Sequence, residues 1–501
     1  MRLMIIFLCF LLAISYTSGE SSNEVNNFSL RLLTSAKDAN IFTPDEPVIL
    51  KVFVRNLTPD DKQAELRYTI VDYYGKKLCN GLKNISISAN QEIEIGIAVA
   101  AAGELPQEEY LEANAEIWYS EDLLIKKTVG IGVLPIRKPK DSGETSCFGL
   151  VDGGGGGYSW YQRIGARWDR PGVNWELSGP FSARKYGVNL AFMFPIPLDC
   201  MGSEIDEKAL NEFSNFIYRT VSKFKDMVKY WQIGNEPDYW SAGSAETLIK
   251  VLEAGYKSAR KADPNCKIVM AGLTGEESPG RQGGFANLVK LGAGNYCDIY
   301  DHHLYMSFPQ IRELLKRTKA DMEKHKAVKP VWVTETSSYF ALPPDAPDAD
   351  RAAWMIKFYT TALSYGVKKI YWFAVYWPFD NDPRWQGLLR PDRTPTLKLF
   401  TYAAMTRELE GAVFSRQIDV SKPELYAYEF THGDYSNLVI WSDGNDYKLN
   451  LRVPNGEVVV TEISGRRTAF SVQKGVFSLT ATVHPVILKL PGKVKLLNVE
   501  K

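Results

Sequence analysis

Two glutamates stand at the ends of apolar runs that lie far apart in the chain. Glu236 follows the run 231–235, and Glu335 follows the run 331–334. Burying a carboxyl group at the end of such a run is costly unless the group has a partner or a chemical task. One carboxylic acid that donates a proton and one carboxylate that attacks carbon are what cleavage of a glycosidic bond requires. The pair therefore predicts that chemistry.

The elements that must position these glutamates follow from the pattern between residues 145 and 407. Short apolar runs alternate there with amphipathic segments, which is typical of a parallel α/β unit. The expected strands cover residues 147–151, 167–170, 189–194, 230–234, 268–271, 299–303, 331–335 and 370–376, and the expected helices include 207–224, 245–261, 285–291 and 350–365. Eight such units in about 260 residues fit a (β/α)8 TIM barrel.

A doubly wound open sheet is the alternative fold for this segment. It would need a glycine-rich phosphate turn, and the glycine run 153–157 is the one candidate. That run lacks the spacing G-x-G-x-x-G, and no Gly-Lys-Ser/Thr occurs in the chain. A loop beside a cleft is the better interpretation of the glycines.

The flanking segments alternate apolar and polar residues with a period of two. Residues 64–71 are the clearest case, and 437–441 and 457–461 show related patterns. Short strands of this kind, separated by turn-rich breaks, predict β-sandwiches. The fold class is thus α/β, a TIM barrel between two sandwiches. The expected parts are a signal peptide at 1–19, an immunoglobulin-like sandwich at 24–137, the barrel at 143–407 and a second sandwich at 408–501.

The net charge limits the classes of partner to be expected, and the first residues indicate where the protein is located. Lys+Arg and Asp+Glu are equal at 59 each, so no overall field favours nucleic acid or anionic membrane. A basic start at Arg2, an apolar run and small residues at 17–19 indicate an export signal. No later run is apolar for about 18 residues, so no membrane span is expected. We expect a secreted or periplasmic protein, and the oligomeric state stays open.

Active sites of such barrels lie at the C-terminal ends of the strands. Glu236 and Glu335 end the fourth and seventh expected strands. These strands face each other across the barrel mouth, which allows the roughly 5–5.5 Å carboxylate separation of a retaining pair.

The tripeptide Asn235-Glu236-Pro237 ending strand four, with a glutamate ending strand seven, resembles clan A of the retaining glycoside hydrolases. The resemblance covers the barrel, and the flanking sandwiches resemble accessory domains found with family 39 and family 5 members. It implies that Glu236 is the general acid/base and Glu335 the nucleophile. It also implies that Asn235 binds the sugar 2-hydroxyl and that Arg170 keeps Glu335 ionised. Arg167 is the other candidate for the arginine.

Strand six is similar to the clan's strand that carries a cleft-facing histidine followed two residues later by tyrosine. His303 and Tyr305 match these positions and share one face, whereas His302 points the other way. Adjacent histidines on a strand diverge and cannot chelate one ion together, so no metal is expected.

Aromatic residues after strands four, seven and eight are candidates for sugar platforms, because rings stack on the apolar faces of sugars. Trp377 is favoured over Trp372 for the clan's strand-eight tryptophan. Further candidates that bind substrate are Tyr339, Trp240 and Trp385, and the loop 342–350 is expected to form a lid or cleft wall.

These observations predict a secreted retaining β-glycoside hydrolase that acts on a β-linked poly- or oligosaccharide. We expect it to cut internal bonds as an endo-enzyme and to need no cofactor. An exo-acting β-glycosidase and a non-catalytic glycan-binding protein are the alternatives. Cys266 and Cys297 precede neighbouring strands and are candidates for a disulfide.

Overall fold

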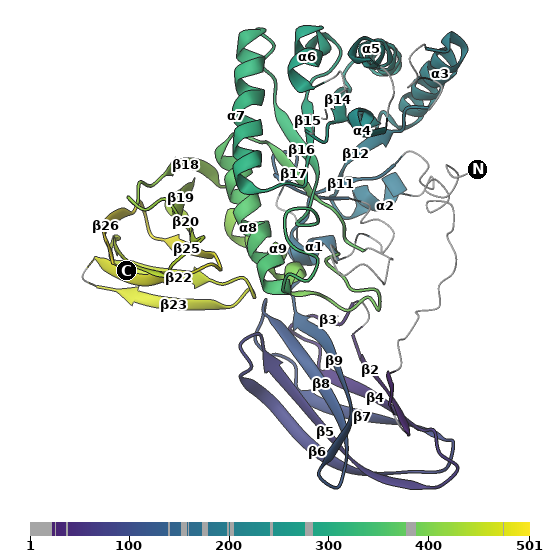
Figure 1. Cartoon of the computed structure of the whole chain (residues 1–501), viewed down its shortest axis with the longest axis vertical. Helices are drawn as coiled ribbons and strands as arrows, with labels where there is room; N and C mark the ends of the chain where they lie inside the picture. The colour runs from purple at the N-terminus through teal and green to yellow at the C-terminus, as the bar shows by residue number, and fades with distance from the viewer. Residues whose placement is uncertain are drawn as a thin grey trace.

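A computed structural model of the chain describes residues 23–25, 27–36, 39–138, 141–151, 158, 160–172, 179–197, 200, 205–240, 244–275, 284–376, 387–473 and 475–500. The expected signal peptide at 1–19 and the glycine run 153–157 lie outside the described residues. Figure 1 shows three parts: a barrel wrapped by helices and two sandwiches that pack against it.

Eight parallel strands form the central barrel, in the order β14-β13-β12-β11-β10-β17-β16-β15. Bridges between Val269 and Ile299 and between Leu273 and His302 join the last strand to the first, so the sheet closes on itself. The predicted TIM barrel is confirmed. The strands are β10 (Phe148–Val151), β11 (Trp168–Arg170), β12 (Asn189–Phe194), β13 (Tyr230–Asn235), β14 (Lys267–Gly272), β15 (Tyr300–Leu304), β16 (Val331–Thr336) and β17 (Lys369–Trp372).

The eighth strand is shorter than the predicted 370–376, because the chain leaves the barrel after Trp372. The amide of Phe373 still donates to Thr336 O at 2.8 Å. Beyond it, Ala374 and Val375 accept hydrogen bonds from Leu388 and Leu389, so this segment pairs with the returning chain instead of the barrel.

Helices alternate with these strands as the periodicity predicts. They are α1 (Tyr161–Ile164), α2 (Gly179–Lys185), α3 (Glu207–Phe224), α4 (Pro237–Trp240), α5 (Ala245–Ala262), α6 (Phe285–Lys290), α7 (Phe308–Lys324), α8 (Asp348–Ser364) and α9 (Leu397–Leu409). Asp206 caps α3 by accepting from the amides of Lys208 and Ala209, and Ser244 caps α5 through Thr247 N. Such caps satisfy amides that have no partner within the helix. None of the helices in the described residues is long and apolar enough to cross a membrane.

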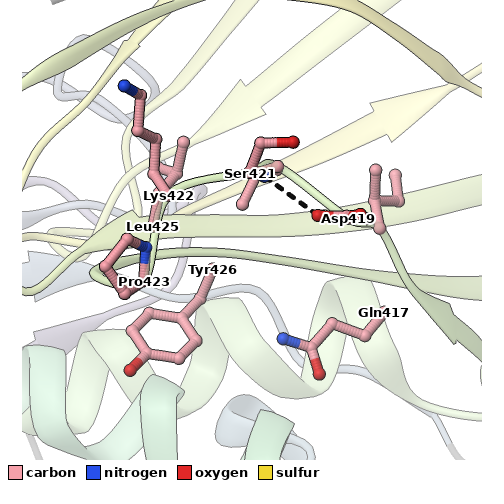
Figure 2. Close-up of a pocket in the computed structure, with 9 residues that line it drawn as sticks. Gln417, Asp419, Ser421, Lys422, Pro423, Leu425 and Tyr426 are labelled. Atoms are coloured by element: carbon pink, nitrogen blue, oxygen red, sulfur yellow. Dashed lines mark hydrogen bonds between the residues drawn. The ribbon is translucent and has the colours of Figure 1, made fainter.

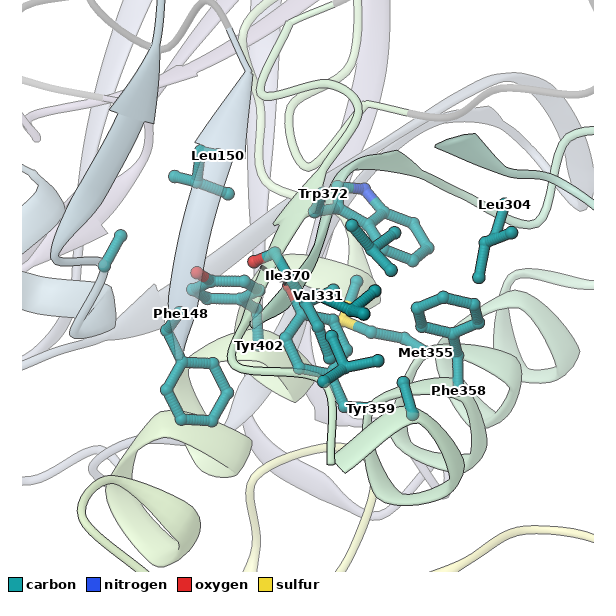
Figure 3. Close-up of a cluster of buried hydrophobic side chains, with 14 of the residues drawn as sticks. Phe148, Leu150, Leu304, Val331, Met355, Phe358, Tyr359, Ile370, Trp372 and Tyr402 are labelled. Carbon is teal, nitrogen blue, oxygen red and sulfur yellow. Dashed lines mark hydrogen bonds between the residues drawn. The ribbon is translucent and has the colours of Figure 1, made fainter. Parts of the chain in front are cut away.

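Two layers of side chains hold the barrel together. Inside it, Trp168, Trp332, Tyr371 and small apolar residues form one cluster. Outside it, a larger apolar layer packs the strands against the helices. Figure 3 shows part of this layer, where Trp372 and Ile370 of β17 meet Met355, Phe358 and Tyr359 of α8. Burying an aromatic or aliphatic side chain contributes about 1.5–3 kcal/mol, so this layer carries much of the barrel's stability.

The N-terminal sandwich consists of two sheets. One has the order β1-β2-β4-β7 and the other β3-β9-β8-β5-β6, with apolar side chains buried between them. The strands are β1 (Asn23–Val25), β2 (Phe28–Thr34), β3 (Ile41–Phe42), β4 (Val48–Asn56), β5 (Lys62–Asp72), β6 (Lys77–Ile87), β7 (Glu92–Ala100), β8 (Tyr110–Tyr119) and β9 (Asp122–Val133). The alternation predicted for residues 64–71 is seen in β5, where Leu66 and Ile70 are buried.

The C-terminal sandwich pairs a six-stranded sheet, β18-β19-β20-β25-β22-β23, with a three-stranded sheet, β24-β21-β26. Its strands are β18 (Val413–Gln417), β19 (Leu425–His432), β20 (Tyr435–Ser442), β21 (Tyr447–Arg452), β22 (Gly456–Thr461), β23 (Arg467–Val472), β24 (Val476–Ala481), β25 (Val486–Leu490) and β26 (Lys495–Glu500). The predicted fold class, a TIM barrel flanked by two β-sandwiches, is confirmed.

Ion pairs and apolar contacts fix the sandwiches to the barrel. Arg407 of α9 donates to Glu108 of the N-terminal sandwich at 2.5 Å, and Lys357 of α8 donates to Asp443 of the C-terminal sandwich at 2.7 Å. The two sandwiches also touch each other, since Arg466 binds Glu109 at 2.9 Å. The Arg407–Glu108 pair is largely buried, and removing one partner of such a pair is costly. The three contacts thus join the sandwiches to the barrel and to each other.

Candidate active site

Glu236 lies directly after β13, where the backbone turns into α4. Gly234 and Glu236 both have positive φ, at 96° and 45°. Such values are easy for glycine and unusual for glutamate. The Glu236 amide donates to Gly272 O of β14 at 3.0 Å, which fixes the turn. The Glu236 side chain is 16% exposed at the barrel mouth.

Glu335 faces the same mouth because β16 contains a bulge. His302 pairs with Val333, whereas the next residue of β15, His303, pairs with Glu335, so Thr334 is the extra residue. In a regular strand, neighbours point to opposite faces. A bulge re-aims side chains, and here Thr334 and Glu335 both turn toward the barrel interior and its mouth.

Arg170 at the end of β11 connects the surroundings of the two glutamates. It donates through Nη1 to Glu335 Oε1 at 2.5 Å, through Nη2 to Asn235 Oδ1 at 2.7 Å, and through Nε to Gln232 Oε1 at 2.5 Å. The side chain is 3% exposed. A planar guanidinium with three fixed partners cannot turn without losing several bonds. Arg167, the other candidate, binds Asp141 O at the opposite end of the strand.

His303 and Tyr305 complete the shell around the carboxylates. His303 Nδ1 lies 2.8 Å from Glu236 Oε1 and 3.6 Å from Glu335 Oε2. Tyr305 donates its hydroxyl hydrogen to Glu335 Oε2 at 2.8 Å. Burial, followed by the charges of Glu335 and Glu236, raises the pKa of Tyr305 well above its usual range, so the hydroxyl stays a donor.

Gly272 makes room for the imidazole of His303. A Cβ atom at this position would lie 2.0 Å from His303 Nε2. His302 points the other way, as predicted, and its Nε2 lies 3.0 Å from Thr318 Oγ1 of α7. Burial and the neighbouring His303 lower the pKa of His302 to about 3, so its imidazole is neutral.

The two glutamates lie close together. One oxygen of Glu236, one oxygen of Glu335 and a ring nitrogen of His303 all lie within 4.8 Å of one another. Donor atoms this close can hold a metal ion, which the sequence did not predict. However, Arg170 and Tyr305 already bind both oxygens of Glu335. A guanidinium at 2.5 Å from a carboxylate disfavours a second cation there.

A second set of polar residues lies beneath the site, inside the barrel. Gln232, Asp301 and Thr334 are completely buried on β13, β15 and β16. Gln232 Nε2 donates to Asp301 Oδ2 at 2.6 Å, and Thr334 donates from its amide to Asp301 Oδ1 at 2.9 Å and from its hydroxyl to Asp301 Oδ2. Burial raises the pKa of Asp301 to about 6, against the opposing effects of His303, Thr334 and Arg170. Sequence reasoning missed these residues, although a polar residue within a buried strand is itself a signal.

The aromatic candidates fall into three groups. Trp372 is buried outside the barrel beside Trp354 of α8, so it does not face the mouth. Trp377, Trp385 and the side chain of Trp240 lie outside the described residues. Tyr339 is half-buried after β16, next to Phe340 with ring centroids 4.6 Å apart.

Two phenylalanines at the mouth were not predicted. Phe340 is 70% exposed and meets the ring of Tyr305 edge-on at 6.3 Å. Phe373 also meets the ring of Tyr305 edge-on, at 6.5 Å. Both rings are therefore close to the nucleophile candidate. The loop 342–350 is held by Arg351 of α8, which donates to the backbone oxygens of Pro343 and Pro344.

The candidate disulfide between Cys266 and Cys297 is not formed. Cys266 and Cys297 are free and buried, and burial raises their pKa values to about 11 and about 12. Strand adjacency alone did not bring the two sulfur atoms into bonding position, because a disulfide also requires particular Cβ directions.

A concavity on the C-terminal sandwich is formed by residues 417–423 with Leu425 and Tyr426 (Figure 2). Tyr426 is its one aromatic ring. This ring stacks on Trp441 at 5.0 Å, and Arg312 of α7 lies over it at 5.1 Å. Since both neighbours occupy the ring, it is not a platform for a sugar, and the barrel mouth is the candidate active site.

Solved structures share this architecture. A family 39 glycoside hydrolase from the gut symbiont Bacteroides cellulosilyticus WH2 matches with a TM-score of 0.65 and 16% identity, over 91% of this chain and 100% of that chain. The chain has the fold of this glycoside hydrolase. The match includes both sandwiches as well as the barrel, which agrees with the resemblance to clan A.

Two further structures match chiefly over part of the chain. A family 30 endoxylanase from Clostridium papyrosolvens C71 has a TM-score of 0.51 and 16% identity, over 68% of this chain and 95% of that one. A glucosidase from Croceicoccus marinus has a TM-score of 0.51 and 13% identity, over 72% and 98%. No protein-family model and no curated protein matches the chain.

Proposed function

We propose that the protein is a retaining β-glycoside hydrolase in which Glu236 is the general acid/base and Glu335 the nucleophile. The observation that carries the proposal is the pair of strand-end carboxylates, with oxygens within 4.8 Å of each other. Retaining enzymes hold their two carboxyl groups at about 5–5.5 Å, whereas inverting enzymes leave room for a water molecule at about 6.5–9.5 Å. The shared fold with a family 39 hydrolase supports the same assignment.

The contacts of each residue fit these roles. Glu335 is bound by Arg170 and Tyr305 and would attack the anomeric carbon as a carboxylate. Glu236 would give its proton to the leaving glycosidic oxygen, which breaks the bond and forms a glycosyl ester on Glu335. Glu236, now ionised, would then take a proton from water, whose oxygen attacks the same carbon and releases Glu335. Two carboxylates and water suffice, so the proposal includes no cofactor.

Asn235 fits a role in binding the sugar at the cleavage point. Its amide oxygen accepts from Arg170, which leaves its amide nitrogen as a donor. We propose that this nitrogen donates to the sugar 2-hydroxyl.

For the substrate we propose a β-linked polysaccharide or oligosaccharide cut at internal bonds. The exposed ring of Phe340 and the half-buried ring of Tyr339 support binding of sugars beyond the cleavage point. One matching structure is an endoxylanase and another is a glucosidase, so xylans and glucans are the first substrates to test.

The test is reducing-sugar release from β-linked xylans, glucans and mannans by wild type and by Glu335→Ala and Glu236→Ala. Release that both variants lose supports the proposal, and early products of mixed chain length support internal cleavage. Single sugars alone would indicate an exo-enzyme. Binding without release on any substrate would favour a glycan-binding protein. The anomeric form of the first product, followed by NMR, distinguishes retention from inversion.

We also propose that the protein is exported. The basic start and apolar run of the first 19 residues support this. Expression of the full chain in a secreting host, followed by N-terminal sequencing of the protein in the medium or periplasm, tests it. Recovery of intact Met1 in the cytoplasm would contradict it.

A further inference from the structure

A directed chain of hydrogen bonds runs under the candidate active site from Arg170 to His303. Arg170 Nε–H donates to Gln232 Oε1, and Gln232 Nε2–H donates to Asp301 Oδ2. The hydroxyl of Thr334 also contacts Asp301 Oδ2, and His303 Nε2 lies 3.1 Å from Thr334 Oγ1. All these side chains are buried. Their donors and acceptors can therefore be assigned by counting.

Asp301 sets the direction of the chain. At neutral pH this carboxylate, with a pKa of about 6, is ionised and can only accept hydrogen bonds. It accepts from the amide of Thr334, from Gln232 and from the hydroxyl of Thr334. The one hydrogen of the Thr334 hydroxyl is thus used on Asp301, and its oxygen is left as an acceptor.

We infer that Asp301 and Thr334 hold a hydrogen on Nε2 of His303, so that Nδ1 is the atom that shares the acid's proton with Glu236. Thr334 Oγ1 has no hydrogen left for the imidazole and must accept from it. His303 Nδ1 is then either an acceptor for a protonated Glu236 or a donor to an ionised one. At 2.8 Å the proton lies between these two groups in both cases.

The charges around His303 favour keeping the proton that lies between Nδ1 and Glu236. Burial opposes a charge on the imidazole, but Glu335 and Glu236 outweigh it and raise the pKa of His303, with Arg170 acting in the opposite direction. Asp301 Oδ2 lies 3.8 Å from His303 Nε2 on the side away from Glu236, and the neighbouring His302 is neutral. The assignment of the tautomer rests on the hydrogen bonds among His303, Thr334 and an ionised Asp301, whereas the role of Glu236 rests on the proposed function.

The consequence for the reaction is that Glu236 and His303 Nδ1 share a place for one proton. When Glu236 gives its proton to the leaving oxygen, its carboxylate and an Nδ1 without a hydrogen face each other as two acceptors at 2.8 Å, which favours the return of one proton to this pair. When Glu236 takes a proton from water, Nδ1 accepts from the restored acid. Thr334 and Asp301 are thus positioning residues, because they touch neither substrate nor reacting atoms.

The first test measures the tautomer in the unmodified protein. The chain has 5 histidines, so NMR of protein labelled with 15N in histidine gives few signals, and His303→Gln assigns the one of interest. From pH 7 to 9 we expect Nε2 of His303 to stay protonated while Nδ1 changes with pH or stays shared. A neutral His303 with its hydrogen on Nδ1 would overturn the inference. This measurement needs no substrate, so it decides the inference even where the proposed function fails.

The second test separates positioning from structure by kinetics. Thr334→Val removes the acceptor for Nε2–H, and Thr334→Ser keeps it as the matched control. General acid assistance contributes about 10²–10⁴-fold, and it matters most for poor leaving groups. We expect Thr334→Val to lower kcat about tenfold or more on alkyl or sugar leaving groups, to shift the pH profile of kcat, and to spare dinitrophenyl glycosides. Thr334→Ser should keep the wild-type kcat on poor leaving groups and the wild-type pH profile. Equal losses on good and poor leaving groups would contradict the role at Glu236.

Discussion

Arg170 and Glu335 are joined by a 2.5 Å hydrogen bond although their strands, β11 and β16, are separated by two others in the barrel. The arginine reaches across the interior because Gln232 and Asn235 of β13 hold its remaining nitrogens. One guanidinium thus fixes the nucleophile candidate relative to the strand that ends in Glu236. Rigid support of this kind is what a carboxylate pair at close range requires, since each would otherwise repel the other.

Arg170→Lys should abolish most activity while the fold remains. A lysine ammonium can keep the charge near Glu335 but cannot bind Gln232 and Asn235 at the same time. Hydrogen bonds to charged groups contribute about 1.5–3 kcal/mol each, so kcat/KM should fall by about 100-fold or more. Arg167→Lys, at the opposite end of the same strand, is the control and should retain activity. Comparable rates for both variants would rule out the positioning role of Arg170.

Gly272→Ala should inactivate the protein by displacing His303. A methyl group at this position would meet the imidazole at 2.0–2.8 Å. Gly272 also lies in β14, where its carbonyl oxygen holds the turn that carries Glu236. Contacts under 3.0 Å force a shift of the ring or of the strand. We expect a loss of kcat with a lower midpoint of thermal unfolding. Gly96→Ala in β7, where a Cβ meets nothing within 4 Å, is the control. An active Gly272→Ala protein would show that His303 is not needed in this position.

The sequence predicted the barrel and much of its mouth because these depend on local patterns. Apolar periodicity located the eight strands, and strand-end positions located Glu236, Glu335 and Arg170. The parity of neighbours on a strand separated His303 from His302. These inferences need the period of the structure and the rule that barrel sites lie at strand ends. The choice of Arg170 and of His303 as the cleft-facing histidine also needed the resemblance to clan A.

The remainder depended on contacts that no local pattern records. The bulge at Thr334 changes which residues face inward, and a strict alternation would place Thr334 and Glu335 on opposite faces. The hydrogen bond between Gln232 and Asp301 could not be predicted, because only the folded barrel brings β13 and β15 close enough for these side chains to meet. The end of β17 at Trp372 could not be predicted from the pattern either, because Ala374 and Val375 are apolar like a barrel strand but pair with the returning chain.

Phe340→Ala should weaken the use of long substrates more than short ones. The ring is 70% exposed beside Tyr305 and does little for the core. Contacts between aromatic rings contribute about 0.5–1.5 kcal/mol. If a sugar face gains a similar amount on Phe340, KM for a polysaccharide should rise by about three- to tenfold, with kcat on a small aryl glycoside unchanged. Tyr119→Ala, on an exposed residue of the N-terminal sandwich, should change neither constant. An unchanged KM for the polysaccharide would exclude Phe340 as a platform.

Lys369→Met should change how stability depends on pH. Lys369 is buried at the base of the barrel, where its ammonium lies 4.1 Å from the ring centroid of Trp168 and donates to the backbone oxygens of Glu144 and Ser146. Burial lowers its pKa to about 8, although Cys147 and Glu144 oppose the shift. Between about pH 8 and the usual lysine pKa near 10.5, the unfolded chain therefore binds more protons at this residue than the folded protein does.

Because the unfolded state binds more protons in that range, the stability of wild type relative to Lys369→Met should increase as the pH rises from 8 to 10.5. Each unit of pKa shift corresponds to about 1.4 kcal/mol, so the difference is on the order of 3 kcal/mol. Urea unfolding of both proteins at several pH values measures it. Lys267→Met, on a side chain that is 43% exposed, is the control and should show no such trend. A wild-type advantage that falls with rising pH would mean that Lys369 keeps its proton more firmly when folded than when unfolded.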